Sequence, residues 1–571
     1  MKKGIALCLV MLMVLATVTG CTQNNGPNSN ESPVSNNTDP NGAVTSTAGQ
    51  PTGGTNATPK EIIIGVDYDA TTFDTHNMDD DGSYIPMRLI GEGLVRNNNG
   101  VISPGVAERW DVSADNLTYT FHLRTNALWS DGTQLSAYDF EYAFKRMLDP
   151  ALGLTNASAG IILFKNAEEY YNGAVTIDKV GFKALNDSTL EITTNDVNIE
   201  TLFSLADYSF FPVKESKVNA EGEAYGSEAD TILTNGAFTM SEWRHEDRQI
   251  LVKNEYYWNK EAIKLDKITR LVNISQDTAY DMLLVGELNA ATFSDITKVE
   301  KLESEGYNSI TYVSTYHFAH MNSTGSSDAT RPFMENINFR RALNYAVNRL
   351  GLTQSVYKGG EPATRITAPI VMGVSLLFNE EYPYQAWPQE GDPVKAKECL
   401  NLALQELGVT LDQVPELSLL CYESQSSTLI LQAVQDMILS TLGIKSKVDP
   451  QPVQQMLEKA DNGDWDLWWG GKDVGDLDWL STFAIDFDYT NISDVSNYHN
   501  DRYLDLLVRA RYATTMKERK DLLFEMEKEL CENPPSILVG WRQAWDVITS
   551  TVTGARINRA VVDYTYADIS Q

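Results

Sequence analysis

The chain has 571 residues, of which 42% are hydrophobic, and a formal net charge of −33 at pH 7. This length exceeds what one compact core organises, so we expect two to four domains. The acidic excess repels nucleic acid and leaves no basic surface that would bind it. The composition therefore suits a multidomain protein with a soluble surface and excludes a nucleic-acid-binding function.

The first 20 residues have the order of a secretion signal. Lys2 and Lys3 precede an uncharged apolar segment, residues 5–16, which is too short to span a bilayer comfortably. Small residues then lead to Cys21, and this order resembles the bacterial lipobox, whose cysteine is lipidated after cleavage. We expect residues 1–20 to be removed and Cys21 to carry a lipid anchor at the extracytoplasmic face of the cell membrane, on the outer surface of a single-membrane bacterium. A plain signal peptide with an incidental cysteine is the alternative.

Residues 21–60 predict a flexible tether behind the lipidated cysteine. Asn, Gly, Pro, Ser and Thr dominate this segment, and little apolar surface is available to offset the entropy of ordering it. A tether of this kind lets an anchored domain move above a membrane.

The remaining cysteines predict no disulfide framework. Apart from Cys8 in the signal and Cys21, the chain has Cys399, Cys421 and Cys531, an odd number at wide spacing. Cys399 and Cys531 fall among apolar helical positions, so we expect buried small hydrophobic residues rather than catalytic thiols.

From residue 61 onward the hydrophobic pattern predicts strands and helices. Residues 61–66 form a short apolar run typical of a buried strand, and residues 118–124 alternate strictly, as in a half-buried strand. Ser136 and Asp139 form a capping box ahead of an amphipathic helix. A hairpin is expected around residues 186–187.

The C-terminal half predicts a parallel sheet. Residues 416–423 are typical of a strand, 428–442 of a helix and 444–450 of a second strand, an order that places the two strands in parallel. Thr515 and Glu518 cap a last amphipathic helix. The predicted fold class is therefore α/β with mixed sheets.

Four ordered blocks of sequence resemble a known family. They are "EGLVRNNNG" through "PGVAERW", then "TYTFHLRTNALWSDGTQLSAYDFEYAFKRMLDP", then "TNGAFTMSEW" with "VKNEYYWN", and "NINFRRALNYAVNR" ahead of "YKGGEPAT" and "APIVMGV". Together they resemble the extracytoplasmic solute-binding proteins of ABC importers, in the oligopeptide/dipeptide group (solute-binding family 5). The resemblance covers nearly everything from Glu61 to Gln571.

The resemblance implies a two-lobed periplasmic-binding-protein-like fold of type II, in its three-domain oligopeptide-binding variety, with a hinge between the lobes. A discontinuous domain I would carry domain II as an insertion, and domain III would form the other lobe. The implied segments are 61–106, 229–324 and 541–571 for domain I, 107–228 for domain II and 325–540 for domain III.

The segment "WDLWWGGKDVGD", residues 465–476, is the candidate ligand-binding segment. An extended peptide needs exposed backbone to pair with, a carboxylate for its amine and flat apolar walls for its side chains. Gly470 and Gly471 would expose backbone, and Trp469 would flank a side-chain pocket. In the family an aspartate of this segment pairs with the ligand amine, and the resemblance places that role at Asp473.

The amine partner stays open between two residues. The segment departs from the family pattern, with Val474 where tyrosine is usual and one extra residue ahead of Asp473, so Asp476 is a rival. A loop carboxylate that caps a nearby helix is the structural alternative for Asp473. In the first block, Glu92 matches a cleft-facing acid of the family.

Most other residues of these blocks are expected to be structural. Arg340 and Arg341, at a helix start, are expected at the surface or in ion pairs rather than on a ligand. Trp465 and Asp466 are expected to end a strand.

Nothing in the sequence predicts catalysis. Gly470-Gly471-Lys472 lacks the earlier glycine and the following Ser or Thr of a phosphate loop, and neither GxSxG nor HExxH occurs. His317 and His320 fall in a predicted strand, on opposite faces, which disfavours a shared metal. We expect no enzyme activity and no cofactor.

The resemblance therefore implies a lipid-anchored monomer that captures oligopeptides by lobe closure and delivers them to the permease subunits of an ABC transporter. Two alternatives remain. The same fold could bind another solute, such as an oligosaccharide or a metal chelate, or the chain could be a surface receptor without a transport role.

Overall fold

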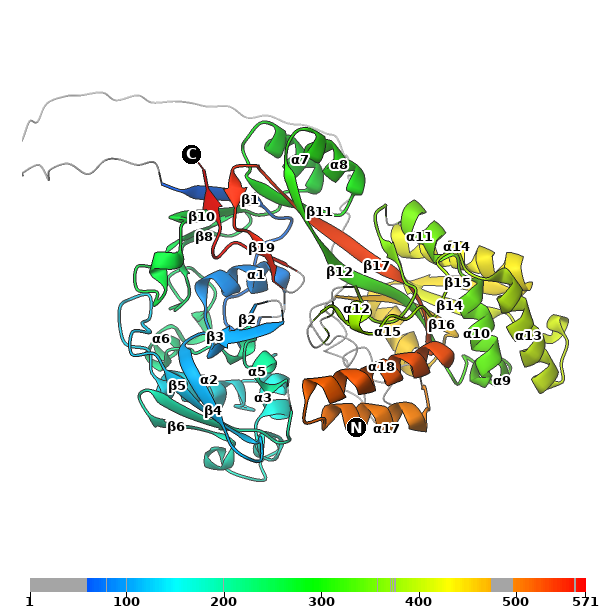
Figure 1. Cartoon of the computed structure of the whole chain (residues 1–571), viewed down its shortest axis with the longest axis horizontal. Helices are drawn as coiled ribbons and strands as arrows, with labels where there is room; N and C mark the ends of the chain where they lie inside the picture. Colours follow the sequence, from blue (N-terminus) through cyan, green and yellow to red (C-terminus); the bar gives the residue numbers. More distant parts are fainter. Residues whose placement is uncertain are drawn as a thin grey trace, which may run out of the picture.

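The computed structural model describes residues 59–570 except 474–496 and the single positions 79, 99, 199, 357, 370, 372, 374, 375, 559 and 560. Cys21 and Asp476 therefore lie outside the described residues. The chain forms two bodies joined by a pair of long strands (Figure 1). The N-lobe contains the helices from α1 (Asp81–Ile90) to α8 (Ile296–Ser304), and the C-lobe those from α9 (Arg331–Glu335) to α18 (Met516–Glu532).

Within the described residues, one eleven-stranded mixed sheet runs through both lobes. Its strands are β1 (Glu61–Gly65), β8 (Phe238–Arg244), β9 (Arg248–Lys253), β10 (Lys267–Leu271), β11 (Ala290–Phe293), β12 (Asn308–Met321), β13 (Glu361–Pro362), β14 (Leu417–Tyr422), β15 (Ser446–Gln451), β16 (Leu467–Asp473) and β17 (Ser536–Ile548). The strand order is β15-β14-β16-β12-β17-β11-β1-β10-β9-β8, and β13 pairs with β17 beside this path. The sheet is therefore mixed, with β1 parallel to β10 and β12 antiparallel to β17.

The strands β12 and β17 connect the lobes as one antiparallel ribbon. Their pairing begins with Asn308 opposite Ile548 and ends with His320 opposite Ser536, and the register shifts after Val313. At one end β17 also pairs with β11 of the N-lobe, and at the other end β12 pairs with β16 of the C-lobe. Both strands thus belong to both lobes, and Figure 1 shows them crossing between the two bodies.

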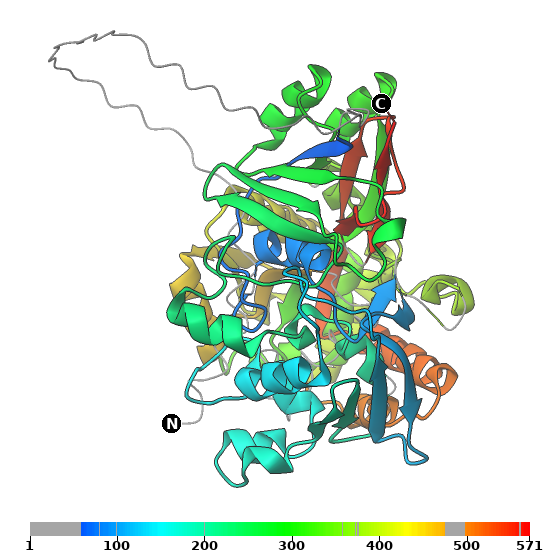
Figure 2. The same ribbon diagram turned by 90° about the vertical axis from the view of Figure 1, so that its left-hand side faces the viewer.

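A four-stranded antiparallel sheet forms the second layer of the N-lobe, in the order β4-β5-β7-β6. Its strands are β4 (Ala107–Val112), β5 (Thr118–Leu123), β6 (Phe182–Asn186) and β7 (Thr189–Thr193). In β5 the alternate residues Tyr119, Phe121 and Leu123 are buried, and β6 and β7 form the expected hairpin, so both predictions are confirmed. Figures 1 and 2 place this sheet and the strands β8 to β10 at opposite ends of the N-lobe.

Local capping signals predicted two helices correctly. The Ser136 and Asp139 capping box precedes α2 (Ala137–Met147), and its apolar face packs on the four-stranded sheet. The Thr515 side chain accepts a hydrogen bond from the Glu518 amide and caps α18. Hydrogen-bonding side chains at these positions satisfy amides that a helix start leaves without partners.

In the C-lobe the predicted βαβ unit is confirmed. Strands β14 and β15 lie parallel on either side of α14 (Gln425–Leu442) in the sequence. The helix begins earlier than expected, at Gln425, because Ser424 accepts a hydrogen bond from the Ser427 amide and caps it. Cys399, Cys421 and Cys531 form no disulfide with one another, and Cys399 and Cys531 are buried, as predicted; Cys421 is buried as well.

The remaining elements surround these sheets. The helices are α3 (Ala157–Leu163), α4 (Ala167–Tyr171), α5 (Thr201–Ser204), α6 (Glu215–Glu221), α7 (Gln276–Leu284), α10 (Ile337–Ala346), α11 (Arg349–Ser355), α12 (Phe378–Glu381), α13 (Pro393–Leu407), α15 (Val453–Asn462) and α17 (Asp501–Arg511). Three small ribbons pair β2 (Val95–Asn98) with β3 (Val101–Pro104), β18 (Val552–Thr553) with β21 (Asp568–Ile569), and β19 (Arg556–Asn558) with β20 (Val561–Asp563). Among the helices that the structure describes, none combines the length and the hydrophobicity needed to cross a bilayer.

Two structural expectations are corrected. Trp465 and Asp466 come before β16, which begins at Leu467, and do not end a strand. Asp466 is buried and accepts hydrogen bonds from the Ser326 amide at 2.8 Å and the Ser418 amide at 2.8 Å, so its role is structural.

Arg340 also differs from the expectation. Its guanidinium is buried and donates to the backbone carbonyls of Met334 at 2.6 Å and Pro534 at 3.1 Å, where surface exposure or an ion pair was expected. Burial lowers the pKa of Arg340 to about 10. Arg341 is half-buried and donates to the Glu532 carbonyl at 2.5 Å.

Candidate functional site

Residues of α1 and β2 line a hollow in the N-lobe. Figure 1 shows these two elements on the side of the N-lobe that faces the C-lobe. The volume of the hollow is about 60 Å³, which accommodates about four water molecules. Charged and polar side chains line it, among them Arg88, Glu92, Arg96 and Asp563. Aromatic side chains such as Tyr84 and Phe211 share the lining, so the hollow combines charged groups with apolar surface.

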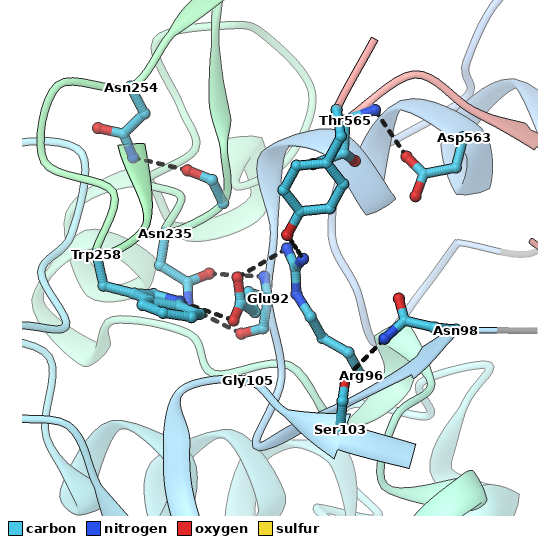
Figure 3. A network of polar contacts seen from close by, with 12 residues as sticks. Glu92, Arg96, Asn98, Ser103, Gly105, Asn235, Asn254, Trp258, Asp563 and Thr565 are labelled. Atoms are coloured by element: carbon cyan, nitrogen blue, oxygen red, sulfur yellow. Dashed lines mark hydrogen bonds and ion pairs between the residues drawn. The ribbon is translucent and has the colours of Figure 1, made fainter. Parts of the chain in front are cut away.

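Glu92 is the centre of a polar network beside this hollow (Figure 3). The Trp258 indole donates to its Oε1 at 2.9 Å, and Arg96 Nη2 lies 3.0 Å from its Oε2. The Asn235 side chain clamps its backbone, because Asn235 Nδ2 donates to the Glu92 carbonyl at 2.8 Å and Asn235 Oδ1 accepts from the Glu92 amide at 3.0 Å. Glu92 is only 2% exposed, and both of its carboxylate oxygens already have partners inside the N-lobe.

Arg96 compensates the buried charge of Glu92. Burial is the largest single influence on Arg96 and would lower its pKa, but Glu92, Tyr257, Tyr566 and Asp563 together outweigh it and raise that pKa above its ordinary value. The guanidinium also donates to the Tyr566 hydroxyl and lies over the Tyr257 ring, 5.8 Å from its centroid. The guanidinium therefore places an opposite charge directly beside the buried Glu92 carboxylate.

The turn that carries Glu92 needs glycine on both sides of it. The Phe211 ring packs across the turn, and a Cβ at Gly91 would lie 2.6 Å from Phe211 Cδ2. At Gly93 a Cβ would lie 3.0 Å from Phe211 Cδ1. Glycine is therefore needed at positions 91 and 93, because a larger residue at either position would collide with the Phe211 ring.

In the C-lobe the candidate segment forms β16, whose backbone has an incompletely paired edge. The strand pairs with β12 from Leu467 through Asp473, whereas its pairing with β14 covers Leu467 and Trp468 only. Over the described residues, the edge from Trp469 onward therefore has a ladder partner on one side alone. An edge of this kind is where an extended peptide can add as a strand.

The Trp469 side chain of this strand packs against the ribbon strand β12. Trp469 is 2% exposed and its indole stacks on the imidazole of His317, with ring centroids 5.8 Å apart. A Cβ at Gly471 would lie 3.0 Å from His317 Cδ2, and a Cβ at Gly470 would lie 3.1 Å from the Phe318 ring. The two glycines therefore leave space for the His317 and Phe318 side chains of β12, and they also leave their own backbone uncovered by side chains.

The predicted site residues fall in two separate places, one in each lobe. Trp469, Gly470, Gly471 and Asp473 are successive positions of β16 in the C-lobe, where the Asp473 backbone pairs with Thr315, and Glu92 belongs to the N-lobe. Asp476 lies outside the described residues. The ligand roles of all these residues stay predictions.

Sequence reasoning missed the partners of Glu92. Arg96 lies four residues after it, a spacing that signals an ion pair only within a helix, whereas these residues belong to a turn and β2. Tyr566 is separated from Arg96 by 470 residues, and no local pattern connects them.

No metal centre is found among the residues that the structure describes, in which no three His, Cys, Asp or Glu side chains gather in a suitable cluster. His317 and His320 both lie in β12. Burial, followed by the charge of Arg542, lowers the pKa of His317 to about 3, so this ring is neutral at physiological pH.

Two lobes, a strand ribbon between them and, over the described residues, a strand edge with a partner on one side define a solute-binding protein of the two-lobed class. Residues 101–493 match the family described as bacterial extracellular solute-binding proteins, family 5, middle part. The chain belongs to family 5 of the bacterial extracellular solute-binding proteins.

Relatives extend this match over most of the chain. The dipeptide-binding protein DppE of Bacillus subtilis is 29% identical over 485 residues, which cover 84% of this chain and 86% of DppE. The oligopeptide-binding protein OppA of Bacillus subtilis is 26% identical over 464 residues, covering 79% of this chain and 81% of OppA. Among solved structures, the unliganded open form of the periplasmic murein tripeptide binding protein MppA has a TM-score of 0.74 and 25% identity, covering 90% of this chain and 98% of that one.

Proposed function

We propose that this chain captures oligopeptides outside the cell by closing its two lobes around them and delivers them to the permease of an ABC transporter. The observation that carries the proposal is the edge of β16, where Gly470 and Gly471 follow the end of the β14 pairing. Peptide-binding relatives that match over most of the chain support the same ligand class. Family 5 is a family of solute-binding proteins, and we propose no enzyme activity and no cofactor for this chain.

In the proposed mechanism an extended peptide adds along β16 and the N-lobe then covers it. Backbone hydrogen bonds to the strand edge would bind peptides of different sequence, because they do not involve ligand side chains. Asp473 would pair with the peptide amine, with Asp476 as the rival, and Trp469 would flank a side-chain pocket. Water exclusion on closure would strengthen each of these polar contacts.

The two lobes are proposed to contain three domains, with domains I and II in one lobe and domain III in the other. Domain I would comprise 61–106, 229–324 and 541–571, domain II 107–228 and domain III 325–540. Separate hydrophobic clusters support the division in outline: one consists mostly of domain II residues and two mostly of domain III residues, each with a few members from domain I.

We also propose that Cys21 carries the lipid that ties the protein to the membrane, with residues 21–60 as the tether. Replacing Cys21 with serine should release the protein from the membrane fraction of expressing cells and abolish incorporation of labelled palmitate. Retention of both in Cys21→Ser would contradict the anchor while leaving the ligand proposal intact.

The ligand class is tested by a thermal-shift screen of the purified protein against peptide and oligosaccharide libraries. Native mass spectrometry of the same preparation identifies any ligand retained from the cell. Peptides should raise the melting temperature, because a ligand that binds only the folded state stabilises it. Stabilisation by oligosaccharides or metal chelates alone would replace the peptide assignment with another solute. Peptide binding without peptide uptake by the cell would favour a surface receptor.

A further inference from the structure

An ion pair joins the two lobes at a place remote from the strand ribbon. Glu200 Oε2 lies 2.8 Å from Arg519 Nη2. Glu200 directly precedes α5 in the N-lobe, and Arg519 belongs to the first turns of α18 in the C-lobe. Figure 1 shows α5 and the α17–α18 pair facing each other across the space below the crossing strands.

Contacts within the C-lobe fix the position of the Arg519 side chain. Its side chain is only 3% exposed, and its Nη1 donates to the Ala510 carbonyl at the end of α17 at 2.7 Å. The Glu200 side chain is 25% exposed. A guanidinium already fixed by its own lobe loses little conformational freedom when it pairs, which makes the contact stronger than one between two mobile surface chains.

The other ion pair between the lobes lies near the ribbon. Within the described residues, Lys358 Nζ lies 3.8 Å from Asp295 Oδ2, and Asp295 caps α8 beside the N-lobe end of the ribbon. A contact close to a hinge resists opening with a short lever arm, whereas one far from it resists with a long one. The Glu200–Arg519 pair therefore has the larger influence on the angle between the lobes.

We propose that Glu200 and Arg519 form a clasp that favours the arrangement in which the two lobes lie close together and that limits how far they open. Opening by hinge motion separates α5 from α18 and must break the pair. Both groups must then be solvated separately. The pair therefore shifts the equilibrium toward the arrangement with the smaller angle between the lobes. This role concerns the lobe angle and does not depend on which solute the protein binds.

Small-angle X-ray scattering of the purified protein, dialysed free of ligand, tests the clasp. The variants are Glu200→Gln, Arg519→Gln and the double variant, and Glu223→Gln, an exposed acid of the same lobe, is the control for the change in charge. Each single variant should enlarge the radius of gyration, because the ratio of molecules with open lobes to molecules with lobes close together should rise by about fivefold.

The double variant should scatter like either single variant, because the second substitution removes a contact that the first has already broken. Glu223→Gln should match the parent protein. Thermal unfolding is recorded in parallel, so that a local packing defect lowers the melting temperature without changing the scattering. Unchanged scattering in both single variants would overturn the clasp, and so would additive effects in the double variant.

Discussion

The indole of Trp469 lies nearly parallel to the imidazole of His317, with 11° between the ring planes and 5.8 Å between the centroids. The first residue belongs to the candidate ligand strand β16 and the second to β12, one of the two strands that connect the lobes. Because burial keeps His317 neutral, the rings stack without the cost of a buried charge. The strand proposed to receive the peptide is thus packed directly on the interlobe ribbon.

The first prediction concerns the space beside this stack. Gly471→Val should lower stability by about 1–3 kcal/mol, because a side chain there has no room and forces the His317 ring to move. Thermal unfolding of Gly471→Ala and Gly471→Val should show a graded loss. The double variant His317→Ala, Gly471→Val should recover part of it. A valine variant as stable as the parent would contradict the packing explanation for this glycine.

The second prediction concerns the buried pair in the N-lobe. Arg96→Met should destabilise the protein by about 3–5 kcal/mol, since it leaves the Glu92 carboxylate buried without its counter-charge. Adding Glu92→Gln should restore much of the loss, because a neutral amide can still accept from Trp258. Melting temperatures of the three variants provide the measurement. If the double variant is no more stable than Arg96→Met, the loss comes from packing instead of charge.

The third prediction separates the two candidate amine partners. Asp473→Asn should weaken binding of peptides with a free amine by about 10- to 100-fold, because it removes a charge-assisted contact. N-acetylated peptides should bind the parent weakly and should be insensitive to the substitution. Isothermal titration calorimetry with matched free and acetylated peptides measures both effects. The same pattern in Asp476→Asn, with Asp473→Asn unaffected, would transfer the role to Asp476.

The fourth prediction concerns pH and a carboxyl at the N-lobe end of the ribbon. Burial raises the pKa of Asp546 from 3.8 to about 6, although Thr292 and Tyr564 donate hydrogen bonds to it. Between these values the folded chain keeps a proton that the unfolded chain has lost, so the contribution of Asp546 to stability falls as pH rises. The total change is about 2–3 kcal/mol and is complete above the folded pKa.

Asp546→Asn should remove this dependence while filling the same space. It should raise the melting temperature relative to the parent at about pH 7 and have little effect at about pH 2.5, where the parent carboxyl is largely protonated in both states. Taking the difference between the two proteins cancels the opposite trend expected from His317. Equal shifts at both pH values would show that Asp546 does not titrate in this window.

Local pattern was sufficient to predict many elements. Alternation predicted β5, because one face of that strand is buried and the other half-exposed. Capping residues predicted α2 and α18, because a side chain within three positions satisfies the free amides. The βαβ unit followed from element order, and the family resemblance was carried by contiguous blocks.

The missed features depend on contacts between distant parts of the chain. Trp258 reaches Glu92 from 166 residues away, and neither residue has a neighbour in sequence that indicates the other. Arg340 resembled a surface residue because charge is usually exposed, yet the carbonyls that surround it come from a helix end and a loop almost two hundred positions later. Such pairings are set by the folded arrangement of the lobes and leave no periodic signal.

The ribbon of β12 and β17 also determines which lobe movements are easy. Its ladder of backbone hydrogen bonds resists stretching and sliding within the plane of the strands, but a two-stranded ribbon bends readily out of that plane. The register irregularities after Val313 and after His317 interrupt the ladder and concentrate the bending there. The connection should therefore be compliant in one direction and stiff in the others. In the proposed mechanism it would guide the N-lobe along the same line of approach over β16 at each closure.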